Sequence, residues 1–176
     1  QKHLGFVFQS YNLLPNLTAV ENVAMPLMFR GVPKEQRERA ARGVLKRVGL
    51  GHRLSHYPRQ MSGGQQQRVG IAAALVTSPR LIIADEPTTA LDSITQRQIV
   101  DLLASLVDDS GASMLFITHD FAVLNHATTR CYVLADGRVA ESGQTADILQ
   151  SPHTKVASQL VTSARALSLR IDAETK

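Results

Sequence analysis

The chain has 176 residues, of which 44% are hydrophobic, enough to bury the core of one domain that includes a subdomain. This composition excludes a disordered tail. The formal net charge of +4 is modest, and the single cysteine excludes a disulfide framework and is typical of a reducing compartment. The apolar runs fall well short of the roughly 20 residues that a spanning helix needs, which excludes a transmembrane segment.

The first residues predict a short strand. No initiator methionine and no charged-then-apolar leader stand at Gln1, so we expect Gln1 to be a cut inside a longer protein. Residues 4–8 form a short apolar run that predicts a buried strand. Polar turn-forming residues at positions 9–12 end it.

A helical region is expected next. One helix starts at about Lys34 and ends at Gly49, and its apolar residues repeat at three- and four-residue spacing. These residues are Ala40, Ala41, Val44, Leu45 and Val48. A further helix begins after Ser62, whose hydroxyl can cap it, and runs to Val76 before Pro79.

From residue 81 onward, strands alternate with helices. Strands are predicted at residues 81–84, 114–118 and 131–135. Between the first two, apolar residues repeat with helical spacing at Ile99, Leu102, Leu103 and Leu106. Strand, helix, strand at this spacing predicts a largely parallel sheet with helices packed on it.

The last part of the chain predicts a hairpin and a helical tail. Asp136-Gly137 is a tight-turn dipeptide between the strand at 131–135, where Cys131 is buried, and residues 138–142. Residues 145 to about 169 are helical in tendency, whereas the polar residues 170–176 are expected to fray.

A basic run lies between Arg30 and Arg59. We interpret it as a solvated helix face in preference to a nucleic-acid site. A membrane-adjacent surface is the other use that such a run fits, since basic groups are favoured near anionic headgroups.

Two acids directly follow the apolar run at 81–84. Asp85 and Glu86 lie where a parallel sheet exposes polar groups to a ligand, at the carboxyl edge. One acid there can hold Mg²⁺ through water, and the second can orient an attacking water. Taken alone, the pair fits a strand that ends in solvent-exposed acids equally well.

The run Ser62-Gly63-Gly64-Gln65 places two residues without a Cβ at a helix start. Backbone N–H groups can then approach an anion closely, and the positive end of the helix points at it. This arrangement suits a terminal phosphate. The bland alternative is a flexible helix cap.

Three motifs, in this order, resemble the ATP-binding cassette (ABC) ATPases: Met61-Ser62-Gly63-Gly64-Gln65, the run from Leu81 to Glu86, and Thr118-His119-Asp120. The resemblance implies an α/β fold, a P-loop NTPase-like core with a mostly parallel sheet, flanking helices and an inserted helical subdomain. Its implied divisions are the end of a core strand and the Q-loop (1–9), the helical subdomain (10–78), the catalytic core with Walker B, D-loop and H-loop (79–144), and a C-terminal helical tail (145–176).

The resemblance also implies catalytic roles. Asp85 would be the Mg²⁺ acid and Glu86 the general base. His119 would hydrogen-bond the γ-phosphate and hold the attacking water and Glu86 in line. Gln9 would touch Mg²⁺ and that water, and would link to the transmembrane partner.

Two further elements are implied to act across a dimer. Ser62, Gly63, Gly64 and Gln65 would contact ATP bound to the opposite subunit, and Asp92 would lie in a loop that crosses the dimer interface. The expected partners are a second nucleotide-binding subunit and transmembrane permease subunits at the cytoplasmic face of the membrane, and no nucleic acid is expected.

The largest departure from the family is that the sequence contains no Gly-x-x-x-x-Gly-Lys-Ser/Thr phosphate loop. We expect ATP hydrolysis coupled to transport in the full protein and an inactive fragment. The alternatives are a degenerate or regulatory subunit and a soluble ABC ATPase of DNA repair or translation. Residues 8–23 resemble the lipoprotein-release and macrolide-export type, whereas residues 84–92, 116–120 and 151–154 resemble oligopeptide and dipeptide importers. The transported substrate therefore stays open.

Overall fold

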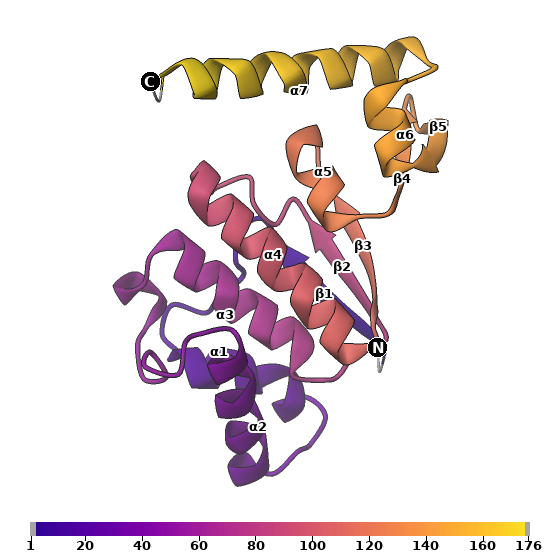
Figure 1. The fold of residues 1–176 in the computed structure, drawn as a ribbon. Coiled ribbons are helices and arrows are strands. Elements are labelled where there is room, and N and C mark those ends of the chain that lie inside the picture. Colours follow the sequence, from indigo (N-terminus) through magenta and orange to yellow (C-terminus); the bar gives the residue numbers. More distant parts are fainter. Residues whose placement is uncertain (1–2, 175–176) are drawn as a thin grey trace. The chain divides into compact units, whose positions relative to one another are not determined.

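The computed structural model describes residues 3–174 and, among these, all side chains but those of residue 122 and residues 165–174. Two compact units divide the chain, Gln1–Ile117 and Thr118–Lys176 (Figure 1). Each unit has its own strands and helices.

The first unit is built on a three-stranded parallel sheet in the order β1-β2-β3, which confirms the predicted parallel sheet. Its strands are β1 (Leu4–Phe8), β2 (Leu81–Asp85) and β3 (Ser113–Ile117), so β3 starts one residue earlier than predicted. Phe8 pairs with Asp85, and Asp85 with Ile117. The carboxyl ends of all three strands therefore meet at one edge of the sheet.

The helices of this unit are α1 (Ala19–Met28), α2 (Lys34–Arg47), α3 (Gly63–Leu75) and α4 (Ser93–Ser110), with a 3-10 turn η1 at Pro58–Gln60. They pack on the sheet through α3, which the other three contact. In Figure 1, α3 and α4 run side by side in front of the strands, and α3 contacts β1 directly. The helices predicted from Lys34 and from Ser62 are confirmed.

Helix α1 was not predicted as a separate helix, because the sequence pattern indicated only a helical region there. Its start is marked by a capping box: the Thr18 Oγ1 accepts a hydrogen bond from the Glu21 N–H, and the Glu21 carboxylate accepts one from the Thr18 N–H. The Thr-x-x-Glu spacing was the available signal. Pro26 inside the helix obscured it.

Strand β1 is half-buried, which corrects the prediction of a buried strand. Val7 is 1% exposed, whereas Phe6 and Phe8 are 46% and 41% exposed, and their rings stack with centroids 5.8 Å apart. Successive side chains of a strand point to opposite faces, and α3 covers only one of them. The apolar run alone could not show which face is covered.

The second unit contains a hairpin and three helices. Its elements are α5 (Phe121–Ala127), β4 (Arg130–Ala135), β5 (Arg138–Gln144), α6 (Thr145–Gln150) and α7 (Lys155–Glu174). Asp136 and Gly137 both have positive φ, 49° and 71°, as a tight hairpin turn requires, which confirms the predicted hairpin. Cys131 is buried as predicted, in a core with Phe121 and Val133.

The helical tail is interrupted and longer than predicted. It breaks after Gln150, beside Pro152, which has no N–H to donate, and α7 then continues to Glu174. Helix α7 thus extends past the predicted end at about residue 169, and the expectation that the polar residues 170–176 fray stays a prediction. Residues 175–176 lie outside the described residues.

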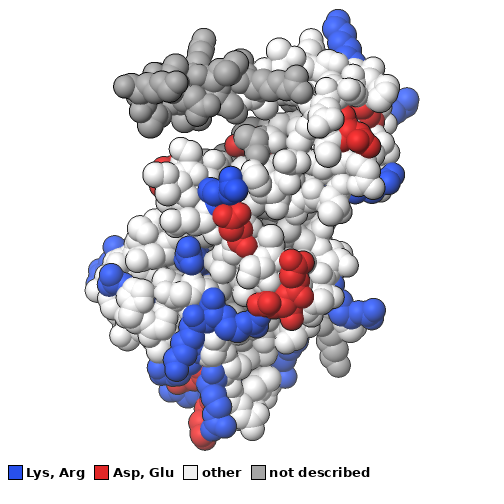
Figure 2. Space-filling view, viewed as in Figure 1, with Lys and Arg blue, Asp and Glu red and all other residues white. Residues whose placement is uncertain are grey.

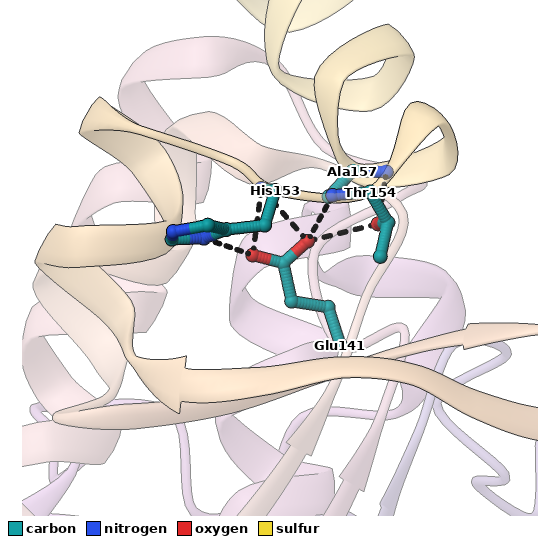
Figure 3. A network of polar contacts seen from close by, with 4 residues as sticks. All are labelled: Glu141, His153, Thr154 and Ala157. Carbon is teal, nitrogen blue, oxygen red and sulfur yellow. Dashed lines mark hydrogen bonds and ion pairs between the residues drawn. The ribbon is translucent and has the colours of Figure 1, made fainter.

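The carboxylate of Glu141, on β5, fixes the start of α7. The Glu141 carboxylate accepts hydrogen bonds from the backbone N–H groups of His153 and Thr154, at 3.0 and 2.9 Å, and from the Thr154 hydroxyl at 2.8 Å (Figure 3). The same hydroxyl accepts from the Ala157 N–H. The N–H groups of His153 and Thr154 lower the pKa of Glu141 from 4.5 to about 2, so this carboxylate is charged and structural at neutral pH.

The basic run between Arg30 and Arg59 lies partly on α2. In Figure 2, Lys and Arg side chains gather at the end of the first unit that holds α2, with acidic side chains among them. Exposed pairs along α2 include Arg39 with Glu35 at 3.0 Å and Lys34 with Glu38 at 3.9 Å. Such pairs contribute little to stability, and the arrangement is that of a solvated helix face.

Candidate active site

The carboxyl edge of the sheet holds three of the predicted residues. Gln9 directly follows β1, Asp85 is the last residue of β2, and Glu86 comes next. Because Phe8 and Asp85 are register partners on adjacent strands, Gln9 and Asp85 lie at the carboxyl ends of neighbouring strands. Both residues are exposed. The structure therefore brings the predicted Mg²⁺ residues to one place.

Glu86 has an unusual backbone conformation. Its φ is +49°, in the left-handed region that costs a residue with a side chain roughly 1–2 kcal/mol. The conformation is held by its N–H, which donates to the Ile117 carbonyl at 2.9 Å. Its Oε2 accepts from the Thr89 hydroxyl at 2.6 Å. Strain of this kind concentrates at functional sites, which supports Glu86 as a reactive group.

Asp85 is the acid suited to a metal ion. Among the described residues, no group of three or more His, Cys, Asp or Glu side chains could form a metal cage. Mg²⁺ does not need one, because it keeps several waters and binds through one or two carboxylates and substrate phosphates. A single exposed carboxylate, on the strand next to the one that Gln9 follows, fits this chemistry.

The start of α3 is capped as predicted. The Ser62 Oγ accepts from the Gln65 N–H at 3.3 Å, and the Gln65 Oε1 accepts from the Ser62 N–H at 3.1 Å. The first turn contains no acidic residue. No described residue accepts a hydrogen bond from the N–H of Gly63 or Gly64. Among the described residues, the positive end of this helix is therefore left without a compensating negative group.

The two glycines also serve the packing of the chain itself. A Cβ on Gly63 would lie 2.7 Å from the Tyr11 hydroxyl oxygen, and a Cβ on Gly64 would lie 2.5 Å from the Thr95 Cγ2. The sequence predicted close approach of an anion, and the structure adds close approach of two side chains. Gly64 is buried, so Gly63 is the more accessible of the pair.

Asp92 caps α4. Its Oδ1 accepts from the Thr95 N–H at 3.0 Å, and this backbone hydrogen bond lowers the pKa of Asp92. Thr95 thus connects Asp92 to Gly64, so the loop that carries Asp92 lies against the start of α3. A role for Asp92 in a dimer interface stays a prediction.

His119 belongs to the second unit. It follows β3 by two residues, in a turn where the Asp120 N–H donates to the Thr118 hydroxyl at 2.9 Å. Its predicted contact with the γ-phosphate stays a prediction.

Sequence reasoning missed three residues of this region. Thr89 holds the Glu86 carboxylate, Tyr11 packs on Gly63, and Gln67 donates to two backbone carbonyls at the sheet edge. For Gln67 a signal was present, because it lies four residues after Gly63 and so on the same helix face. The other two depend on contacts between separate elements.

The chain is similar to a known protein family and to solved structures. The family described as ABC transporter matches residues 1–89 of the 176. A dimeric ATP-binding cassette, MJ0796, solved in a post-hydrolysis state with ADP and Pi, is similar with a TM-score of 0.70 and 43% sequence identity. The match covers 81% of this chain and 63% of that one.

Two curated relatives are similar at comparable identity. The methionine import ATP-binding protein MetN of Rhodopseudomonas palustris (strain BisA53) is 43% identical over 163 residues, 93% of this chain and 44% of the relative. The macrolide export ATP-binding/permease protein MacB of Pasteurella multocida (strain Pm70) is 45% identical over 159 residues, 90% of this chain and 24% of the relative. The chain thus spans less than half the length of either relative.

Proposed function

Because the chain belongs to the ABC transporter family, we propose that the protein containing it is an ATP-hydrolysing subunit that drives transport across a membrane. The proposal is supported by the residues that meet at the carboxyl edge of the sheet. An exposed Asp85, a strained Glu86 and Gln9 lie at the ends of neighbouring parallel strands.

Each residue there has a chemical task. Asp85, with the Gln9 amide beside it, would hold Mg²⁺, which when bound neutralises charge on the ATP phosphates. The Glu86 carboxylate would accept the proton of the attacking water, and Thr89 fixes its orientation. The γ-phosphate contact is assigned to His119.

The start of α3 is assigned to nucleotide bound on a second subunit. Its uncompensated positive end and the N–H groups of Gly63 and Gly64 suit a phosphate, and Ser62 and Gln65 fix its geometry. The MJ0796 cassette is dimeric, which supports a partner cassette here, and Asp92 would lie in that interface.

These 176 residues supply no phosphate loop of their own, and we propose that the loop is supplied by residues outside them. The sequence contains no Gly-x-x-x-x-Gly-Lys-Ser/Thr segment, and without its amides and lysine most contacts to the β- and γ-phosphates are missing. Residues 1–176 by themselves are therefore expected to bind and hydrolyse no ATP.

A groove in the first unit suits a permease subunit. It measures about 520 Å³ and is lined mainly by apolar side chains of β1, the loop after Gln9, α1 and α3. Phe29, at the end of α1, is 78% exposed at its rim. No described helix is long and apolar enough to cross a membrane. We assign the groove to a cytoplasmic helix of a permease, and we propose that the subunit lies peripherally at the cytoplasmic face of the membrane.

No transported substrate is assigned. MetN is named for methionine import and MacB for macrolide export, and both match this chain at similar identity. These two matches therefore do not distinguish one cargo from another.

The test is Glu86→Gln in the full-length protein. We expect retained ATP binding and a loss of turnover of about 10²- to 10⁴-fold, because the amide cannot accept the proton of the water. Steady-state phosphate release measures turnover, and size-exclusion chromatography with ATP reports a trapped dimer. Glu35→Gln, an exposed substitution on α2, is the matched control. Unchanged turnover in Glu86→Gln would overturn the assignment.

The permease is tested by crosslinking in membranes. A cysteine introduced at Phe29 should crosslink to a permease subunit, whereas one at Gln159 on α7 should not. Crosslinks only from α7 would contradict the docking groove. Cys131 is buried and leaves a low background.

A further inference from the structure

Gln67 is a fully buried polar residue in the middle of α3. Its exposed fraction is 0%, although glutamine is mostly found at protein surfaces. A buried amide is costly unless its hydrogen bonds are made. The structure shows what Gln67 does with them.

The Gln67 side-chain amide joins two strand ends. Its Nε2 donates to the Phe8 carbonyl at 3.2 Å and to the Pro87 carbonyl at 2.7 Å. Phe8 immediately precedes Gln9, and Pro87 immediately follows Glu86. One NH₂ group thus holds the backbone beside the proposed Mg²⁺ residue and beside the proposed base.

The remaining atom of this amide is unsatisfied. No described residue donates a hydrogen bond to the buried Gln67 Oε1. Both observed acceptors are carbonyl oxygens, so the amide cannot be turned over to satisfy Oε1 without losing its two bonds. The orientation of this amide is therefore fixed by its two bonds to the carbonyl oxygens.

The surroundings make this link stiff. Gly63, Gln67 and Gly70 lie on one face of α3, at spacings of four and three residues. A Cβ on Gly63 would lie 2.7 Å from the Tyr11 hydroxyl oxygen, and one on Gly70 would lie 3.2 Å from the Tyr11 carbonyl oxygen. The segment after Gln9 therefore lies tightly along the helix that begins with the glycines.

We propose that Gln67 is a positioning residue for ATP hydrolysis, tying the segments of Gln9 and Glu86 to the helix that starts at Ser62. This inference rests on the proposed function and deepens it. A displacement at the start of α3 is transmitted through one buried amide to both groups that act on Mg²⁺ and water. The chemistry of Gln67 itself does not enter the reaction.

The experiment compares Gln67→Met with Gln66→Met in the full-length protein. Methionine keeps the length of the side chain and removes both donors. Gln66 is the matched control, because its amide also donates to a backbone carbonyl, that of Met61 at 3.1 Å, but reaches neither strand end.

For Gln67→Met we expect kcat to fall about 10- to 100-fold, because misplacement of catalytic groups by about 1 Å costs up to that factor. The KM for Mg·ATP should stay near the wild-type value, and Gln66→Met should keep both constants. Wild-type kcat in Gln67→Met, or an equal fall in the control, overturns the inference. A wild-type protein without ATPase activity would instead overturn the proposed function.

Nuclear magnetic resonance of the wild-type protein covers the case in which Gln67→Met does not fold. The side-chain amide signal of Gln67, assigned by ¹⁵N labelling, should exchange slowly with solvent and shift on addition of Mg·ATP, while that of Gln66 should not shift. If the chemical shift of the Gln67 amide does not change on addition of Mg·ATP, the inference is overturned.

Discussion

Two helices of the first unit begin with the same capping motif but differ in the charge at their N-terminal ends. α1 and α3 each begin with a capping box, formed by Thr18 with Glu21 and by Ser62 with Gln65. In each, a hydroxyl accepts from the N–H three residues on, and the side chain of that later residue accepts in return. The hydrogen-bond geometry at the two helix starts is therefore the same, whereas the charge of the third residue differs.

The difference lies in what compensates the positive helix end. In α1 the third residue is the anionic Glu21, and the N–H groups of Ala19 and Val20 donate to the carbonyls of His56 and Leu54. In α3 the third residue is the neutral Gln65, and no described residue accepts from Gly63 or Gly64. The same cap thus closes one helix end and leaves the other ready for an anion.

The first prediction converts one start into the other. Gln65→Glu keeps the capping box but places a negative charge where a phosphate is proposed to bind. We expect at least about a tenfold loss of ATP turnover in the full-length protein, because a like-charge contact of about 1.4 kcal/mol already has that effect. The reverse change at the other helix, Glu21→Gln, should leave turnover unchanged. Equal effects of the two would remove the distinction between the helix ends.

The second prediction concerns the glycines. Gly64→Ala should lower stability by about 1–3 kcal/mol of overpacking, since the new Cβ would meet the Thr95 Cγ2, partly offset by about 1 kcal/mol of helix propensity. Thr95→Ser removes that methyl group and should restore stability in the double variant. Chemical denaturation measures both. A double variant no more stable than Gly64→Ala would show that the contact with Thr95 is not the cause.

The third prediction compares the two capping hydroxyls. Thr18→Ala and Ser62→Ala should each lower the free energy of unfolding by about 1 kcal/mol, the usual loss on removing such a cap. Only Ser62→Ala should also lower ATP turnover, because only that helix end is proposed to face nucleotide. Denaturation curves and phosphate release, measured on the same preparations, separate the two effects. A fall in turnover for Thr18→Ala of the same size would contradict the comparison.

The smallest expected effect is the response to acid. The hydrogen bond from the Thr18 backbone is the main cause that lowers the pKa of Glu21 from its ordinary 4.5. A carboxyl whose pKa is lower in the folded state stabilises the fold above its ordinary pKa, and this contribution is lost as the pH falls below 4.5. Glu21→Gln should therefore flatten the dependence of stability on pH slightly below that value. Gln65→Ala should leave the pH dependence unchanged, because Gln65 does not titrate.

Much of this molecule follows from local sequence. The cap at Ser62 and the turn at Asp136-Gly137 depend on residues a few positions apart, so their patterns were sufficient. The same kind of pattern located the three parallel strands to within one residue at their ends. The acids at the end of β2 were found for the same reason, since apolar residues followed by Asp85 and Glu86 already predict a strand that ends at a sheet edge.

The remainder was decided only by tertiary structure. The exposure of Phe6 and Phe8, the positive φ of Glu86 and the contact of Tyr11 with Gly63 depend on which element covers which. Gln67 is the clearest case: its amide reaches the Phe8 carbonyl, 59 residues away in the chain, and the Pro87 carbonyl, 20 residues away. Helical spacing predicts the face on which a side chain lies. It does not predict the partner there, because hydrogen-bond partners distant in sequence are set by how strands and helices pack.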